Sequence, residues 1–126
     1  MPIARIELAR GKSPEHVKAI GQAVYDAMLA IGVPQNDRFQ VITEHDPARL
    51  VFDRTYLGIE RTDDFILVQI TMNEGRTLEL KKKLYQGIAD GIHAATGVRK
   101  QDVMINLVEV KKENWSFGNG VAQYAS

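Results

Sequence analysis

The fold of this chain is decided by two similar stretches, "GKSPEHVKAIGQAVYDAMLAIGVPQND" at residues 11–37 and "GRTLELKKKLYQGIADGIHAATGVRKQD" at residues 75–102. Both read glycine, base, hydroxyl, any residue and glutamate, followed by an amphipathic segment and Gly-Val-x-x-x-Asp. The offset between them is 64 residues and becomes 65 after a one-residue slip. The matching pairs are Gly11/Gly75, Lys12/Arg76, Ser13/Thr77, Glu15/Glu79, Gly32/Gly97, Val33/Val98 and Asp37/Asp102. This similarity indicates two copies of one supersecondary unit.

Each copy predicts one amphipathic helix. Ser13 and Thr77 are good N-cap residues, and each is followed by a glutamate in the first turn. Gly32 and Gly97 stand where a helix C-terminus favours positive φ. Apolar residues recur between these signals at spacings of three and four, which makes one apolar stripe per helix. The stripes comprise Val17, Ile20, Val24, Met28 and Ile31 in the first copy and Leu84, Ile88, Ile92 and Ala95 in the second.

Strands are expected on both sides of each helix, at residues 2–8 and 39–43 in the first copy and at 65–72 and 103–109 in the second. A helix that crosses one face of a sheet makes the two strands of its unit parallel. The fold class is therefore α+β, with a four-stranded mainly parallel or mixed sheet and two helices on one face. The runs "FILVQIT" (65–71) and "VMINLVE" (103–109) are nearly continuously apolar, which predicts central strands covered on both faces or by a partner.

The length of 126 residues favours one domain, spanning 1–126, with internal repeats at 2–43 and 65–109 and a C-terminal flap at 110–126. Residues 44–64 join the copies and contain an expected short strand at 49–53. The tail "ENWSFGNGVAQYAS" (113–126) has aromatic residues between glycines, which is typical of a hairpin or flap. No third long helix is expected, so neighbouring subunits are the natural cover for the second sheet face.

The composition argues against several classes of partner. Sixteen basic and sixteen acidic residues balance, so neither nucleic acid nor an anionic membrane surface is expected to bind. The chain has no cysteine, and no apolar stretch approaches the length of a membrane span. We expect a cytoplasmic protein without a cofactor or metal. The acidic and histidine residues of "EHD" (44–46) would point to opposite faces of a strand and would not chelate together.

The chain opens "MPIARIEL", and the proline at position 2 is a candidate catalytic group. A methionine before a small proline is usually removed during synthesis, which would leave a secondary amine at the N-terminus. An ordinary α-amino group titrates at about pH 8. Burial and a nearby cation both disfavour its protonated form, so the pKa of such an amine can be brought near the working pH of a base.

The chain resembles the tautomerase superfamily, and within it the malonate semialdehyde decarboxylase-like branch. The resemblance rests on Pro2, on "GVPQNDRFQ" (32–40), on "GRTLELKKKLY" (75–85) and on "NWSFGNG" (114–120). It implies a homotrimer with the sheets on the inside and the proline at the floor of a pocket for a small carboxylate substrate. The site residues that it implies are catalytic Pro2, Asp37 and Arg76 and substrate-binding Trp115, Phe117 and Tyr124.

The sequence departs from the decarboxylase pattern at one position. The first of two carboxylate-binding arginines aligns with Asn73, so this residue joins the substrate-binding set and decarboxylation becomes the second expectation. The first is a tautomerase that uses the amino-terminal proline as general base on a small oxo- or enol-carboxylic acid. The alternatives are malonate semialdehyde decarboxylation or hydration of an unsaturated acid with the proline as acid, a non-catalytic trimeric binding protein, and a ferredoxin-like nucleic-acid binder.

Each candidate also has a structural explanation. Arg76 corresponds to Lys12 in the repeat, and Asp37 corresponds to Asp102, so both members of each pair can serve only to shape a helix start or a turn. Trp115 and Phe117 can form an apolar plug between subunits.

Overall fold

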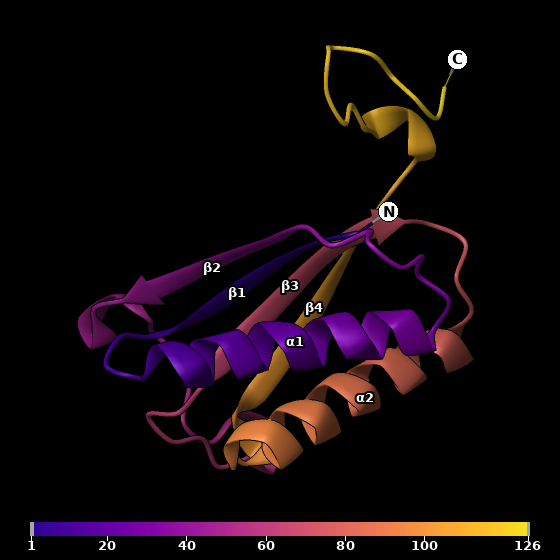
Figure 1. Cartoon of the computed structure of the whole chain (residues 1–126). Coiled ribbons are helices and arrows are strands. Elements are labelled where there is room, and N and C mark those ends of the chain that lie inside the picture. Colours follow the sequence, from indigo (N-terminus) through magenta and orange to yellow (C-terminus); the bar gives the residue numbers. More distant parts are fainter. Residues whose placement is uncertain (1, 126) are drawn as a thin grey trace.

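The computed structural model describes residues 2–125, which form a four-stranded sheet covered on one face by two helices (Figure 1). The strands are β1 (Ile3–Ala9), β2 (Gln40–His45), β3 (Ile66–Asn73) and β4 (Val103–Val110), and the helices are α1 (Pro14–Ala30) and α2 (Leu78–Thr96). Short 3-10 helices lie at Pro47–Arg49, Tyr56–Gly58, Lys100–Asp102 and Lys112–Asn114. The predicted α+β fold with two helices on one face is confirmed.

Both helices begin and end at the predicted signals. The Ser13 hydroxyl accepts a hydrogen bond from the His16 N–H at 3.1 Å, and the Thr77 hydroxyl accepts one from the Leu80 N–H at 3.2 Å. These caps satisfy amides of the first turn that have no partner within the helix. At the other end, Gly32 has a φ of +96° and Gly97 a φ of +78°, the left-handed region in which a side chain is strained.

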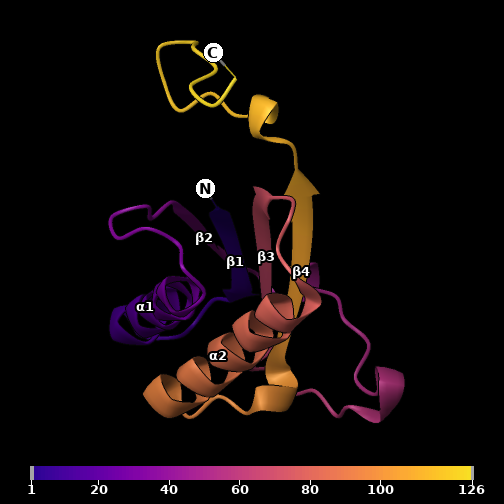
Figure 2. The ribbon, with the colours of Figure 1, turned by 90° about the vertical axis from the view of Figure 1, so that its right-hand side faces the viewer.

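The sheet has the strand order β2-β1-β3-β4. Within each repeat the two strands are parallel, and β1 pairs with β3 antiparallel, with Ile3 opposite Thr71. The start of β1 therefore lies beside the end of β3 (Figures 1 and 2). We call this the Pro2 end of the sheet. The end at which β1 finishes and β3 begins is called the opposite end. The two ends are equivalent in the duplicated chain.

One expectation about the strands is wrong. "FILVQIT" forms most of the central strand β3, but "VMINLVE" forms β4, which is an edge strand. The antiparallel pairing of β1 with β3 occupies the centre of the sheet and leaves β2 and β4 outside. Met104 and Val108 of β4 consequently remain 49% and 39% exposed on the face that the helices do not cover.

The core lies between the sheet and the two helices. Alternate residues of β1 and β3 point at the helices and are buried against the predicted helical stripes, as the two-residue period of a strand requires. The sheet contributes Ala4, Ile6, Leu8, Ile66, Val68, Ile70 and Met72, and the helices contribute chiefly Ile20, Val24, Met28, Leu84, Ile88 and Ile92. The helices approach closely where α2 has glycine: a Cβ on Gly91 would come within 3.3 Å of the Ala23 Cβ.

The expected strand at 49–53 is also wrong. This segment follows the 3-10 helix Pro47–Arg49, in which the Asp46 carboxylate accepts a hydrogen bond from the Ala48 N–H at 3.1 Å. Proline lacks a ladder donor, and the aspartate side chain favours a turn over a strand. The apolar character of the segment instead serves packing, since the Phe52 ring stacks on the Phe65 ring with centroids 4.2 Å apart.

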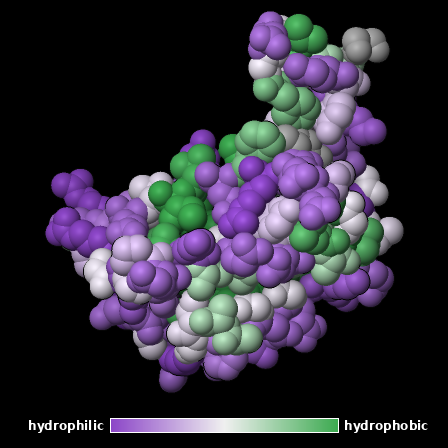
Figure 3. Space-filling view, viewed as in Figure 1, coloured by the Kyte–Doolittle hydropathy of each residue, from purple (hydrophilic) through white to green (hydrophobic). Residues whose placement is uncertain are grey.

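The tail after β4 stands out from the body beside the Pro2 end (Figures 1 and 2). Residues 111–125 contain no strand, so the hairpin alternative is wrong and the flap stays a prediction. Figure 3 shows apolar and hydrophilic groups side by side on this projection. Within residues 2–125, no helix is both long and apolar enough to cross a membrane.

Candidate active site

The Pro2 end of the sheet gathers most of the predicted site residues. Pro2 immediately precedes β1, Asp37 lies in the loop before β2, and Asn73 is the last residue of β3. Arg76 lies one residue before the N-cap of α2. Pro2, Asp37 and Arg76 are 35 to 74 positions apart in the sequence, and they gather here because the antiparallel β1–β3 pair brings the two repeats together head to tail. The site therefore depends on both copies of the duplicated unit.

Pro2 is fully buried. Its neighbour Ile3 pairs with Thr71, so the proline adjoins the last residues of β3. On the other side, the Ala4 N–H donates to the Phe39 carbonyl at 3.0 Å, which ties the start of β1 to the loop that carries Asp37. The removal of Met1, on which a terminal amine depends, concerns a residue outside the described range.

The Asp37 loop is held on α1 by contacts to both neighbours of the aspartate. The Tyr25 hydroxyl accepts a hydrogen bond from the Asn36 N–H at 3.1 Å, and Asn36 adopts a φ of +70°. The Arg38 guanidinium lies over the Tyr25 ring, 4.8 Å from its centroid, and donates to the Gln22 side chain at 3.0 Å. These contacts leave little freedom to the residue between them. Sequence reasoning missed Tyr25, because nothing in the helical pattern distinguishes it from an ordinary amphipathic position.

The Asp37 carboxylate is not satisfied by the residues that surround it. Its Oδ1 atom is buried, and no group in residues 2–125 donates a hydrogen bond to it. Burial raises the pKa of this carboxyl above its ordinary value, and positive charges that include Arg76 act in the opposite direction. A buried polar atom without a partner is costly, and such groups are found preferentially where function requires them.

Arg76 likewise keeps its charge available. Its Nη1 donates to the main-chain carbonyl of Asn73 at 3.3 Å, and the side chain is partly buried. Among residues 2–125, no carboxylate lies within ion-pair distance of the guanidinium. A planar guanidinium of this kind binds a carboxylate through two parallel hydrogen bonds.

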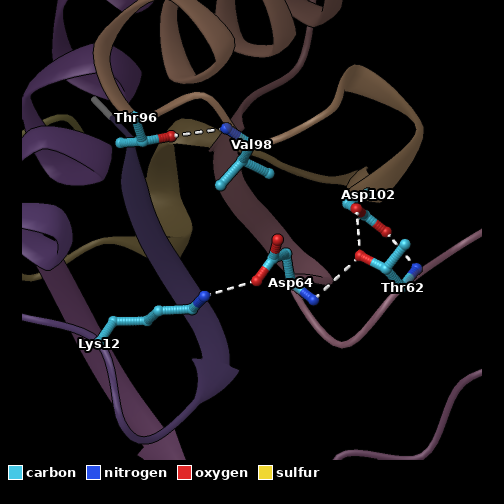
Figure 4. A network of polar contacts seen from close by, with 6 residues as sticks. All are labelled: Lys12, Thr62, Asp64, Thr96, Val98 and Asp102. Carbon is cyan, nitrogen blue, oxygen red and sulfur yellow. Dashed lines mark hydrogen bonds and ion pairs between the residues drawn. The ribbon is translucent and has the colours of Figure 1, made fainter.

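At the opposite end of the sheet, the side chains at the equivalent repeat positions have partners within the chain (Figure 4). Asp102 is fully buried, and its two carboxylate oxygens accept hydrogen bonds from the Thr62 N–H and hydroxyl, both at 2.6 Å. Lys12 forms an ion pair with Asp64, whose N–H donates to the Thr62 hydroxyl at 3.2 Å. At this end Asp102 is therefore hydrogen-bonded to Thr62 and Lys12 is ion-paired with Asp64. At the Pro2 end, the described residues supply no such partners for Asp37 Oδ1 and no carboxylate for Arg76.

The tail contributes a cluster of three aromatic rings. The indole Nε1–H of Trp115 donates to Oδ1 of Asn73 at 2.7 Å. The Phe117 ring stacks on the Trp115 ring at 5.5 Å between centroids, and the Tyr124 ring meets Phe117 edge-on at 5.1 Å. Gln123 closes the segment, accepting from the Phe117 N–H and donating to the Gly118 carbonyl. Sequence reasoning missed Gln123, which the pattern of aromatic residues does not single out.

No group of three or more histidine, aspartate or glutamate side chains within residues 2–125 is arranged to hold a metal ion. The groups gathered at the Pro2 end are a buried proline, an unsatisfied carboxylate, an unpaired guanidinium and an aromatic cluster. They suit proton transfer on a small organic acid that carries one carboxylate.

Comparison with known proteins agrees with this chemistry. A family model described as "Tautomerase enzyme" matches residues 37–118. The chain is 42% identical to the probable tautomerase YusQ of Bacillus subtilis (strain 168), over 98% of each chain. It is 36% identical to a malonate semialdehyde decarboxylase solved with the inhibitor 3-bromopropiolate, which superposes with a TM-score of 0.90 over 97% of this chain and 93% of that one.

A fused 4-OT structure that forms a symmetric trimer shares the fold, with 24% identity and a TM-score of 0.79 over 98% of both chains. The family match, the identities and the coverage agree with the resemblance seen in the sequence. They support an activity of the tautomerase or decarboxylase type. The chain therefore belongs to the tautomerase superfamily of enzymes, in the branch that resembles malonate semialdehyde decarboxylase.

Proposed function

We propose that this protein is a tautomerase that uses Pro2, exposed as the amino-terminal residue by removal of Met1, as general base on a small oxo- or enol-carboxylic acid. The observation that carries the proposal is the contrast between the two equivalent ends of the sheet. The aspartate and the cation of the opposite end are paired, whereas those beside the buried proline are left without such partners. A ligand with a carboxylate and a transferable proton would supply partners for these groups of the Pro2 end.

In the proposed reaction, the substrate carboxylate binds the Arg76 guanidinium through two hydrogen bonds, assisted by the side chain of Asn73. The neutral Pro2 nitrogen takes the proton from the enol oxygen, and the carbonyl forms as the carbon–carbon double bond shifts. The same nitrogen then delivers the proton to the carbon, which regenerates the free amine. Positioned proton transfer of this kind contributes typically about 10²- to 10⁴-fold to a rate.

Asp37 has a defined part in this cycle. The protonated form of Pro2 is an ammonium group, and a nearby carboxylate stabilises it while the proton is held. The unsatisfied Oδ1 of Asp37 is an acceptor suited to that ammonium or to a bound water. The rings of Trp115, Phe117 and Tyr124 would exclude water and so strengthen the charge interactions within the site.

We further propose that the protein assembles as a homotrimer through the sheet face opposite the helices. This face carries apolar residues that the chain itself leaves exposed, including Val41, Met104 and Val108. The fused 4-OT relative of the same fold is a symmetric trimer. Sedimentation equilibrium of the purified protein tests this assembly, and a monomeric mass at micromolar concentration would contradict it.

Decarboxylation of malonate semialdehyde is the second candidate, favoured by the 36% identity to a decarboxylase over nearly the whole chain. In this reaction a protonated Pro2 would polarise the aldehyde oxygen. The bond to the carboxylate then breaks, its electron pair passes into the enol of acetaldehyde, and carbon dioxide leaves. The Asp37 carboxylate favours the ammonium form that this route needs, while Asn73 offers no second cation for the carboxylate.

The deciding experiment is ketonisation of phenylenolpyruvate followed by ultraviolet absorbance. Intact mass first establishes that Met1 is absent, and the wild type is then compared with Pro2→Ala. Turnover that falls at least about a hundredfold in the variant supports the base role, in line with the usual contribution of general base catalysis. Equal rates, or no turnover by Met1-free wild type, would refute the tautomerase proposal, and release of carbon dioxide from malonate semialdehyde is then measured on the same pair.

A further inference from the structure

Asn73 is placed to do more than line the site. Its side-chain Oδ1 accepts the Trp115 indole N–H at 2.7 Å, and its main-chain carbonyl accepts from Arg76 at 3.3 Å. An indole nitrogen is only a donor, so the amide oxygen of Asn73 must be the atom that faces it. One residue at the end of β3 therefore contacts both the cation of the proposed site and the aromatic tail.

The bond to Asn73 is the hydrogen bond that joins the tail to the body. Among residues 115–125, the other described side-chain and turn hydrogen bonds are internal or reach only Lys112 at the base of the tail. The contacts among the three aromatic rings and the two Gln123 hydrogen bonds make residues 115–124 a unit. Among the described hydrogen bonds, the one from Trp115 to Asn73 is therefore the one that fixes this unit relative to the Pro2 end.

We propose that Asn73 is a positioning residue whose side-chain amide holds the C-terminal aromatic segment, residues 115–124, against the Arg76 site. The inference rests on the proposed function for the meaning of that site. Asn73 acts here through Trp115 and not on the reacting atoms. The neutral amide at this position thus anchors the tail without adding a charge beside Arg76.

The two contacts of Asn73 can be separated by substitution. Asn73→Ala removes the anchor for Trp115 but keeps the main-chain carbonyl that accepts from Arg76. Asn73→Asp keeps an oxygen acceptor for the indole but adds a negative charge beside the guanidinium. Asn114→Ala is a matched control, because it truncates an exposed asparagine next to Trp115 that anchors nothing through its side chain among the described residues.

The chain has one tryptophan, so its fluorescence reports on Trp115 alone. In Asn73→Ala we expect emission at longer wavelength and an acrylamide quenching constant at least twofold higher than in wild type. We expect KM for phenylenolpyruvate to rise about three- to tenfold, the effect of losing one hydrogen bond, with kcat changed less than twofold. Asn73→Asp should retain the wild-type emission while KM rises at least tenfold, and Asn114→Ala should match wild type in every readout.

Unchanged emission and quenching in Asn73→Ala would overturn the proposal, as would a loss confined to kcat. If Met1-free wild type shows no turnover, the proposed function fails and the fluorescence comparison alone decides whether Asn73 holds the tail. If turnover depends on Pro2 but Asn73→Ala behaves as wild type, the positioning role fails and the proposed function stands. Circular dichroism of each variant establishes that the fold is retained.

Discussion

The two equivalent aspartates should respond in opposite ways to one substitution, aspartate to asparagine. In Asp102→Asn, one of two oxygens that each accept a 2.6 Å bond from Thr62 becomes an amide nitrogen. A partly buried donor of Thr62 then loses the acceptor supplied by the fully buried side chain at position 102, which costs about 2 kcal/mol. For a chain of 126 residues this lowers Tm by roughly 7 °C.

Asp37→Asn removes a charge whose buried Oδ1 has no donor in the described residues, so the folded state loses no hydrogen bond there. We expect unchanged stability, or a gain of at most about 1 kcal/mol, together with a loss of activity. The sign of its pH dependence follows from the raised pKa of Asp37. The folded state binds the proton more tightly than the unfolded state, so wild-type stability falls as pH rises through this range and any gain in Asp37→Asn disappears at acid pH.

The assay is urea unfolding of both variants and wild type at one protein concentration, since assembly makes stability depend on concentration. Measurements at neutral pH and at about pH 4, near the ordinary pKa of a carboxyl group, test the sign of the effect. Equal destabilisation of the two variants would refute the argument that the Pro2 end is left unsatisfied for function. A stability difference for Asp37→Asn that grows toward acid pH would refute the linkage.

Three further changes test the structure. Arg76→Gln should raise KM for phenylenolpyruvate about 10- to 100-fold, because a charged hydrogen-bond pair to the substrate carboxylate is lost. Its repeat counterpart, Lys12→Gln, should change KM less than about twofold. It should lower the free energy of unfolding by less than about 1 kcal/mol, since the ion pair of Lys12 with Asp64 is exposed. Tyr25→Phe should lower the free energy of unfolding by about 1 kcal/mol and reduce kcat, because the Asn36 N–H beside Asp37 loses the hydroxyl that accepts its hydrogen bond. Urea unfolding measures the first effect and steady-state kinetics the second. Gly97→Ala should lower Tm by roughly 4 °C in calorimetry without affecting KM, because a side chain at a φ of +78° costs about 1 kcal/mol.

The helices and the paired strands could be predicted from the sequence because their determinants are local. The caps at Ser13 and Thr77, the apolar stripes and the glycines at helix ends act within a few residues. The structure places them as predicted, except that Ala95 of the second stripe is exposed. Because the unit is duplicated, the parallel β-α-β arrangement inferred for one copy also holds for the other. The strand predicted at 49–53 does not form. Its apolar residues are compatible with a strand, but they are equally compatible with the packing of Phe52 on Phe65 that the structure shows.

The order of the strands was decided only by the tertiary structure. Parallel pairing inside each unit follows from the crossing helix. Which strands meet between the units depends instead on pairs of residues 58 to 68 positions apart, such as Ile3 with Thr71. That pairing leaves β4 at the edge and brings the start of β1, which Pro2 precedes, beside the end of β3 at Asn73. Local propensity contains no information about it.

The sequence alone could name the residues of the candidate site, but it could not show which of them have hydrogen-bond or ion-pair partners. Asp37 and Asp102 have the same repeat context, and only the folded chain places Thr62 against one and no described donor against the buried oxygen of the other. The same holds for Asn73, whose link to Trp115 joins positions 42 residues apart. Residue types and spacing determined the family, the helices and the candidate groups, because these follow from local chemistry. Which charged groups have a partner and which do not was decided by long-range packing, because the fold supplies the hydrogen-bond partners.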